Sequence, residues 1–407
     1  MDLIVYAIPA FILLIAIELI IQHIRKSPLY RFNDMVTNIN CGVTQQVTGV
    51  LSKSLLVVTY LWIYDQWRLF TIPDTWYTWL ILFIGVDFFY YLAHRYAHEI
   101  ALLWGSHAVH HQSEEYNLSV ALRQSAIQTF VTSWFYLPLA FLGFSFTSFL
   151  FMASVQTLYQ FWIHTKLIKK MPAWFEFVFN TPSHHRVHHG SDPRYIDKNH
   201  GGTLIIFDRI FGTFVEEDEE AHYGVTKPVN SWNVVWANIE YYKWLGQVFT
   251  QARGFDKFRV LFKKTGWRPD YLGGPLHPQD TPAGYTKYNA DTSLLMHIYI
   301  MIQFIALLAG TSVFLFNVTQ YDTIEKITYI LLILWLVINI GGIFEQKRWI
   351  VVSETLRIII TLFLILTMNP LIHMWIKTVV LLSFTGFFMI YLTFRYIDSK
   401  RKSPNFV

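Results

Sequence analysis

Nine long apolar runs constrain this chain more than any other feature. They lie near residues 3–22, 44–64, 76–93, 126–143, 145–163, 293–318, 326–344, 350–368 and 371–394. About 20 apolar residues are enough for a helix to cross a bilayer, where the backbone must satisfy its own hydrogen bonds. The runs therefore predict an all-α, polytopic integral membrane protein with about nine transmembrane helices.

The runs differ in how well they fit a span. The first has no basic segment before it and no A-x-A site after it, so it predicts a retained helix and not a signal peptide. The second is the weakest, because Gln45, Gln46 and Lys53 interrupt it. The fourth and fifth are separated only by a short turn around Gly143, which predicts a helical hairpin.

The basic residues predict the orientation of the spans. Clusters follow the first, third, fifth, seventh and ninth runs, at Arg25/Lys26/Arg31, Arg95/Arg123, Lys166/Lys169/Lys170, Lys347/Arg348 and Lys400/Arg401/Lys402. With an outside N-terminus, all of them fall on the cytoplasmic side. A bacterial inner membrane or the endoplasmic reticulum is the expected location.

The same pattern divides the chain into three parts. Residues 1–250 form a membrane catalytic domain, 251–290 a cytoplasmic linker and 291–407 a group of C-terminal transmembrane helices. The net charge of +4 is too small to favour nucleic acid as a partner. A single cysteine, Cys41, excludes an intrachain disulfide, a cysteine-bound Fe–S cluster and a Cys-rich zinc site.

Eleven of the 16 histidines lie between His94 and His200. Three clusters repeat the spacing of one helical face: His94 and His98, then His107, His110 and His111, then His185, His188 and His189. A lone histidine on an apolar helix is usually structural, but three such clusters predict metal ligation. Eight imidazoles exceed the four ligands of a structural zinc, so a di-metal site of Fe, Cu, Ni or Zn is expected, facing the cytoplasm.

Residues near the clusters are candidates for supporting roles. Asp87 lies seven residues before His94 and is expected to accept a ring N–H from a bound histidine. Thr181 is expected to cap the third helix, with Pro182 at its first position and Gly190 ending it in a left-handed conformation.

Beyond spacing, the motifs resemble a known family. HRYAH (94–98), HAVHH (107–111) and HHRVHH (184–189) resemble the three histidine boxes of the fatty acid hydroxylase/sterol desaturase superfamily, which are membrane di-iron enzymes. The stretches HQSEEYNLSVALRQS (111–125) and DKNHGGTLIIFDRIFGTF (197–214) are similar to alkylglycerol monooxygenases. This resemblance extends over nearly the whole chain.

The resemblance implies roles for individual residues. Two irons would be bound by His94, His98, His107, His110, His111, His164, His185, His188 and His189. Supporting or cofactor-related positions would be Asp87, Glu99, Glu115, His184 and His200. A substrate pocket would include Tyr116, Asn117, Arg123 and Gln124. His200 departs from the family pattern, in which a tyrosine is expected, and is either a further ligand or a pocket residue.

The implied reaction is hydroxylation of the ether-bearing carbon of an O-alkylglycerol by O2 and tetrahydrobiopterin, which releases a fatty aldehyde and a glycerol derivative. The chain has no G-x-G-x-x-G fingerprint, so electrons are expected from an external donor. One alternative is a related hydroxylase or desaturase that acts on a sterol, carotenoid or acyl lipid with a separate redox protein. Another is a metal transporter, which would place its ligands near the middle of the membrane.

Overall fold

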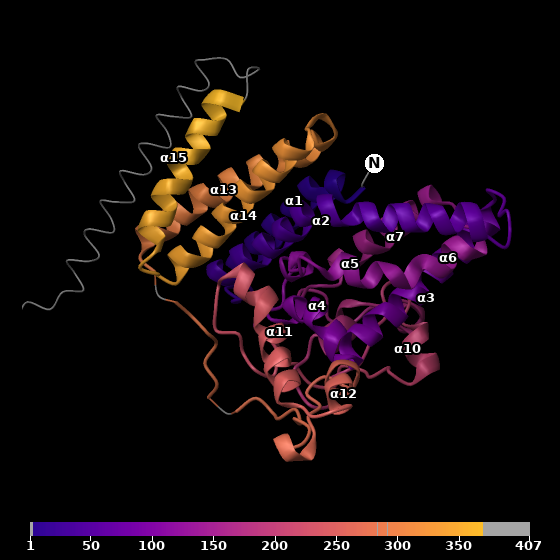
Figure 1. Ribbon diagram of the computed structural model, residues 1–407. Helices are drawn as coiled ribbons and strands as arrows, with labels where there is room; N and C mark the ends of the chain where they lie inside the picture. Colours follow the sequence, from indigo (N-terminus) through magenta and orange to yellow (C-terminus); the bar gives the residue numbers. More distant parts are fainter. Residues whose placement is uncertain (1–2, 283, 291, 369–407) are drawn as a thin grey trace, which may run out of the picture. The chain divides into compact units, whose positions relative to one another are not determined.

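The computed structural model describes residues 3–282, 284–290 and 292–368 (Figure 1). Within these ranges the chain forms helices and no β-strand, and two isolated bridges pair Phe179 with Leu204 and Gly190 with Tyr223. The all-α prediction is confirmed for this part of the chain. The chain divides into two compact units: Met1–Asn230 with Val235–Tyr288, and Ser231–Val234 with Asn289–Val407, of which residues up to 368 are described.

Three helices of the first unit are long and apolar enough to cross a membrane: α1 (Leu3–Arg25), α2 (Phe32–Trp67) and α3 (Trp76–Glu99). Their exposed side chains include large apolar ones such as Leu13 and Ile81, as expected where lipid covers a helix. Two helices of the second unit meet the same criteria. These five helices fit an integral membrane protein, whereas the count of nine spans and their orientation stay predictions.

The fourth apolar run is an interrupted helix and not one regular span. It forms α5 (Gln128–Thr132), η2 (Ser133–Tyr136) and α6 (Leu137–Leu142) in succession. Pro138 has no backbone N–H, and the Ser133 hydroxyl donates to the Thr129 carbonyl at 2.5 Å. Both features compete with the regular helical hydrogen bonds, and so the run contains a 3₁₀ segment.

The expected turn between the fourth and fifth runs is present. Helix α7 (Phe146–Trp162) follows α6 after Gly143, whose φ of 105° is left-handed. A β-carbon on Gly143 would lie 2.0 Å from the Phe70 carbonyl oxygen. Glycine is therefore required here both for the backbone conformation and for the close approach of the neighbouring loop.

Short helices fill the rest of the first unit. They are α4 (Ala101–His111), η1 (Val120–Leu122), α8 (Ala173–Val178), α9 (Pro182–His188), α10 (Ile206–Phe211), α11 (Val234–Gln251), α12 (Asp256–Phe262) and η3 (Asp270–Leu272). Ala101 of α4, Leu245 and Val248 of α11 and Val260 of α12 share one buried apolar cluster. This cluster fixes α4, which carries the second histidine box.

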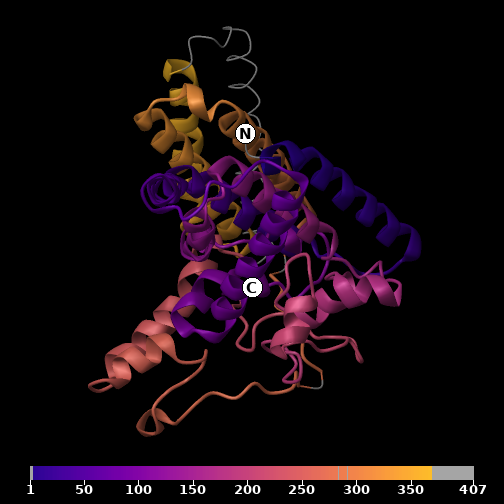
Figure 2. The same cartoon turned by 90° about the vertical axis from the view of Figure 1, so that its right-hand side faces the viewer.

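The second unit consists of apolar helices that lie side by side in both views (Figures 1 and 2). They are α13 (Leu294–Phe316), α14 (Thr323–Phe344) and α15 (Ile350–Met368), with η4 (Val318–Gln320) between the first two. These bounds agree with the sixth to eighth apolar runs. The ninth run lies outside the described residues.

Candidate metal centre

The three histidine boxes occupy the last turns of helices. His94 and His98 end α3, His107 to His111 end α4, and α9 carries the third box. Only Ile100 separates α3 from α4, and the ring centroids of His98 and His107 lie 5.0 Å apart, so the first two boxes adjoin each other. His164 lies two residues after α7 and joins them from a fourth segment.

The imidazoles form two groups, and each group contains histidines from more than one box. The first group contains His94, His98, His107, His111 and His188, and the second contains His110, His164, His185 and His189. Within each group, one nitrogen per ring lies within 4.8 Å of the others. Histidines four apart point in directions about 40° apart and share a group, whereas the histidine between them points about 60° to the other side and joins the second group.

The ring nitrogens approach each other as ligands of a shared ion would. The Nε2 atom of His107 lies 2.9 Å from that of His94 and 3.1 Å from that of His111. In the second group, two Nε2 pairs that include His164 are 3.0 and 3.3 Å apart. Two nitrogens that bind one metal at about 2.1 Å lie about 3 Å apart when the angle between them is near 90°. The geometry fits one metal ion in each group.

Backbone carbonyls hold the second ring nitrogen of several histidines. The Nδ1 atoms of His94, His110, His164 and His188 lie 2.8–2.9 Å from the carbonyl oxygens of His200, Arg123, Gln160 and Lys198, respectively. A carbonyl only accepts, so Nδ1 carries the proton and Nε2 keeps its lone pair for a metal. The buried Nε2 atoms of His98, His188 and His189 have no hydrogen-bond partner, which again fits ligation.

Burial keeps the imidazoles in the form that binds metal. Loss of hydration lowers the pKa of His107, His111, His185 and His188 well below its usual value, and repulsion from neighbouring rings adds to the shift. The same loss of hydration lowers the pKa of His110 to about 4. These rings are therefore neutral near pH 7, as ligand histidines must be.

The start of α9 agrees with the prediction in part. Pro182 takes the first helical position, and Thr181 before it is extended. The Thr181 hydroxyl does not cap the helix, because it bonds to Ser183 at 3.0 Å and to Glu176 at 3.3 Å. A buried network of side chains thus replaces the expected side-chain cap.

The predicted left-handed end of α9 at Gly190 is wrong. The helix ends at His188, the next residue His189 has a right-handed φ of −80°, and Gly190 has no positive φ. Gly190 is needed for space: a β-carbon there would lie 2.8 Å from the Tyr195 ring and 3.0 Å from the Val187 carbonyl oxygen. The absence of a side chain at Gly190 lets the segment after the third box pack closely against Tyr195 and Val187.

Asp87 holds a loop and does not meet the expected histidine. Its carboxylate accepts hydrogen bonds from the backbone N–H groups of Thr203 and Leu204 at 2.7 and 2.8 Å, and from the Gln156 side chain at 2.8 Å. These donors offset the cost of burying the carboxylate. A β-carbon on Gly202 would lie 2.8 Å from Asp87 Oδ1, so the loop between α9 and α10 packs tightly on α3.

The other carboxylates near the boxes pair with cations. Glu99 accepts from Arg95 at 3.0 Å, and Glu115 accepts from Arg31 at 2.5 Å and from Lys287 at 2.7 Å. Within the described part of the chain, neither carboxylate is hydrogen-bonded to an imidazole. Both fix the segments around the centre.

His184 and His200 lie outside both groups. The His184 ring packs 5.3 Å from the Phe214 ring, and burial lowers its pKa to about 4. His200 is fully buried, its ring centroid lies 5.0 Å from that of His98, and neither of its ring nitrogens has a hydrogen-bond partner. His200 thus lies beside the first group with both nitrogens available.

Of the four expected pocket residues, three are hydrogen-bonded to backbone carbonyls and one lies beside a histidine of the second group. Tyr116, Asn117 and Arg123 donate to the backbone carbonyls of Ile163, Leu29 and Val109 at 3.0, 2.8 and 2.7 Å, respectively. The Gln124 amide nitrogen lies 3.4 Å from His110 Nδ1, and its buried Oε1 has no hydrogen-bond partner. Gln124 therefore presents an available acceptor next to the second group.

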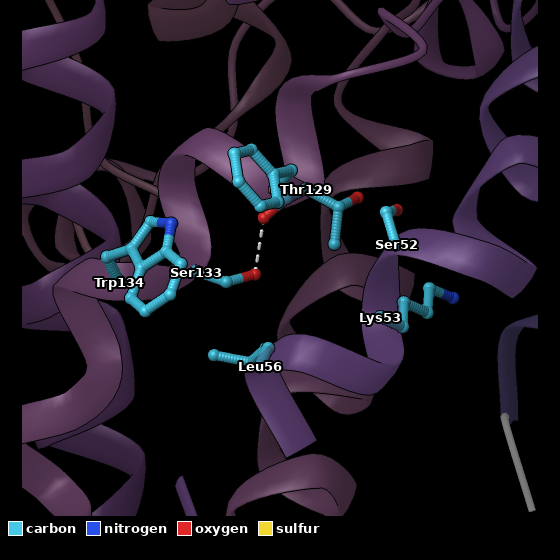
Figure 3. A pocket seen from close by; sticks show the side chains of 7 residues that line it. Ser52, Lys53, Leu56, Thr129, Ser133 and Trp134 are labelled. Carbon is cyan, nitrogen blue, oxygen red and sulfur yellow. Dashed lines mark hydrogen bonds between the residues drawn. The ribbon is translucent and has the colours of Figure 1, made fainter. Parts of the chain in front are cut away.

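A pocket lies apart from the histidines, between α2 and the α5–η2 segment (Figure 3). It is lined by Ser52, Lys53, Leu56, Thr129, Phe130, Ser133 and Trp134. None of these belongs to either histidine group, so the pocket is not the metal centre.

Two glutamines that sequence reasoning missed support the centre from α7. Gln156 binds Asp87, and the Gln160 carbonyl accepts from His164. A signal was present for Gln156, because Gln156 and Gln160 are four apart on α7 and share one face. The Gln160 carbonyl belongs to the backbone, so no side-chain pattern could have identified it.

Comparison with known proteins agrees with this geometry. The fatty acid hydroxylase family model matches residues 79–213, which contain both histidine groups. The chain is 38% identical to alkylglycerol monooxygenase of Homo sapiens, over 89% of this chain and 82% of that protein, and 38% identical to that of Xenopus tropicalis, over 87% and 80%. It is 31% identical to ornithine lipid hydroxylase OlsE of Rhizobium tropici over 35% of this chain and 44% of that protein. No solved structure matches the chain.

Proposed function

Because the chain belongs to the alkylglycerol monooxygenase family, we propose that it is a membrane monooxygenase that hydroxylates the ether-linked carbon of O-alkylglycerol lipids. One observation carries the chemistry. Nine buried imidazoles converge in two groups, and no thiolate or carboxylate from the described part of the chain takes part in either.

The donor set fits two irons, one held by each group. Nitrogen ligands without thiolate suit iron, and neutral imidazoles leave the ions more positively charged than carboxylates would. When bound, the irons supply the activation of O2 that oxidation of an unactivated C–H bond requires. The protein's part is to hold the imidazoles in the correct tautomer, through the carbonyls of His200, Arg123, Gln160 and Lys198.

The reaction balances with a two-electron donor. One oxygen atom enters the C–H bond next to the ether oxygen, and the other leaves as water after taking up two electrons and two protons. The resulting hemiacetal breaks its C–O bond to give a fatty aldehyde and a glycerol derivative. We assign tetrahydrobiopterin as the electron donor, with Glu99 and Glu115 as candidates that support its use.

Two side chains are placed to act on the lipid. The Gln124 Oε1 atom is available to accept a hydrogen bond from a glycerol hydroxyl beside the second group. His200 is buried beside the first group, and we assign it to the wall around the reacting carbon. The glycerol head would lie at the cytoplasmic surface of a bacterial inner membrane or of the endoplasmic reticulum, and the alkyl chain would extend into the bilayer.

The test uses purified, iron-loaded full-length protein with a 1-O-alkylglycerol and O2. Release of the fatty aldehyde with tetrahydrobiopterin, but not with a ferredoxin or cytochrome, is the expected result. Turnover of a sterol or acyl lipid with a redox protein would favour the related hydroxylase instead. Lipid turnover that is retained in His188→Ala, together with an altered metal flux, would contradict both enzymes.

A further inference from the structure

Helix α12 and the residue before it expose three phenylalanines on one face. Phe255, Phe258 and Phe262 are 70%, 60% and 59% exposed. Their spacing of three and four places them in one stripe along the helix. Val260 points to the opposite side and is buried in the cluster with α4 and α11. The helix is therefore attached by one face and leaves its other apolar face uncovered within the described chain.

The same segment is strongly basic. Residues 253–264 contain the cations Arg253, Lys257, Arg259, Lys263 and Lys264. Asp256 is the one acidic residue of the segment, so five positive charges less one negative charge give +4. An apolar face bordered by cations is the pattern of helices that lie in the interface of a bilayer with anionic lipids.

Hydrogen bonds join the segment that follows α12 to the end of α3 and the start of α4. The Lys263 carbonyl accepts from the Ala101 N–H at 3.0 Å, and the Thr265 hydroxyl donates to the His98 carbonyl at 2.8 Å. The apolar run of α3 ends near residue 93, so His98 lies about 8 Å beyond it along the helix. The headgroup layer of a bilayer has a similar thickness, about 5–8 Å on each side.

We propose that Phe255 and α12 form an interfacial membrane anchor. The three phenylalanines insert between the lipid headgroups, and the surrounding cations contact anionic headgroups. The segment that follows α12 is hydrogen-bonded to the end of a candidate membrane span, and the charge around the uncovered face is complementary to an anionic bilayer. Both features favour lipid over a second protein as the occupant. The proposal is independent of the reaction that the metal centre performs.

The anchor is attached directly to the metal centre. Thr265 bonds to the backbone of His98, and Lys263 bonds to the first residue of the helix that carries the second histidine box. Insertion of α12 therefore fixes the depth of both boxes relative to the lipid. A helix that only packed against protein would have no such effect.

The test measures depth with a single label. Cys41, the chain's one cysteine, is fully buried, so an introduced cysteine can be labelled selectively. Phe258→Cys carries an environment-sensitive fluorophore in full-length protein reconstituted into vesicles that contain bromine-labelled lipids. Ile84→Cys, exposed on the span α3, is the control within the membrane, and Glu219→Cys, on the acidic loop with a 71% exposed side chain, is the control in water.

The label at position 258 is expected to lose fluorescence to the brominated lipids as the label at position 84 does. Its emission should also shift to the blue in vesicles with anionic lipids compared with zwitterionic ones. Access to aqueous iodide equal to that at position 219 would overturn the proposal. In detergent, protection of the label from iodide could instead increase with protein concentration. That result would show that a second copy of the chain covers the face, and it would also overturn the proposal.

A triple variant, Phe255→Ser/Phe258→Ser/Phe262→Ser, tests the apolar contacts separately. A fluorophore at position 257 should be quenched less by brominated lipids in the triple variant than in the protein that keeps all three phenylalanines. Unchanged metal content would show that both proteins fold. Equal quenching in the two proteins would contradict insertion of the phenylalanines.

Discussion

Neighbouring histidines in this chain belong to different groups of imidazoles. His110 and His111 are adjacent in sequence but belong to different groups, and so do His188 and His189. Adjacent residues on a helix point about 100° apart, and so one short helix contributes imidazoles to both groups. Both α4 and α9 do so, and a distortion of either helix should disturb both groups.

Removing one ligand should affect one ion more than the other. We expect His185→Ala to lower the iron content from two ions per chain towards one, because His185 belongs to the group of four. His184→Ala is the matched control, since His184 is buried next to it but lies outside both groups. Metal analysis of both purified variants gives the answer, and equal iron loss would contradict the assignment.

Gln124 should affect lipid binding and leave the metal content unchanged. Gln124→Met keeps the length of the side chain but removes the buried acceptor. Loss of one hydrogen bond to a glycerol hydroxyl costs about 0.5–1.5 kcal/mol, which raises KM by about 2- to 12-fold with kcat nearly unchanged. Steady-state kinetics measures both constants, with Gln247→Met on the exposed side of α11 as the control. An unchanged KM would remove Gln124 from the pocket.

At the residue scale, the sequence predicted which histidines meet but not how they divide. Spacing places histidines three and four apart on one face, and the structure brings nine of them together. Helical geometry separates the histidines of one helix, but which histidines of different helices share a group depends on the angle at which the three helices cross, and no local pattern encodes that angle. Asp87 shows the same limit, because its partners Thr203 and Leu204 are more than a hundred residues away in the chain.

At the scale of elements, close backbone approaches hold the loop between α9 and α10. Gly202→Ala would place a β-carbon 2.6 Å from Gln156 Nε2 and 2.8 Å from Asp87 Oδ1. We expect a loss of about 1–3 kcal/mol in the free energy of unfolding, because the buried network must shift. Gly246→Ala in α11 is the control: its β-carbon would meet nothing within 4 Å, and alanine favours a helix by about 0.5–1 kcal/mol. Thermal unfolding that ranks the two variants in the opposite order would contradict this packing.

A buried polar network should stabilise the helices of the second unit. Glu354 accepts hydrogen bonds from Arg357 at 2.6 Å, from Tyr299 at 2.6 Å and from Asn339 at 2.7 Å, which joins α15 to α13 and α14. Glu354→Ala leaves the Arg357 charge buried without its partner and should cost about 3–5 kcal/mol. The double variant Glu354→Leu/Arg357→Met removes both charges and should cost less. A double variant that is less stable than Glu354→Ala would contradict this account.

Element boundaries were predictable where the apolar runs are regular. The runs at 293–318 and 326–344 match α13 and α14 closely. The run at 126–143 is as apolar, but local hydrogen bonds of Ser133 and the missing N–H of Pro138 change its geometry. The end of α9 was wrongly predicted for a related reason, since Gly190 meets a steric need set by Tyr195 and not the need of a helix end.

For the whole molecule, the buried imidazoles should make stability depend on pH. In the unfolded chain these histidines bind protons near pH 6.5, whereas burial lowers their pKa in the folded protein, to about 4 for His110. Between these values the unfolded state binds more protons, so stability is fully present above pH 6.5 and falls as the pH decreases. Between the unfolded and the folded pKa, each such histidine lowers the free energy of unfolding by about 1.4 kcal/mol for every unit by which the pH falls.

We therefore expect the thermal midpoint of the metal-free protein to fall steeply between pH 6.5 and pH 5. In the iron-loaded protein the fall should begin at lower pH, because metal binds only the folded state and competes with protons for the same lone pairs. Thermal unfolding of both forms across this range measures the difference. A double variant that replaces the exposed His23 and His277 is the control, since it removes no buried imidazole. Coincident curves for the metal-free and iron-loaded forms would show that the buried imidazoles do not bind the metal.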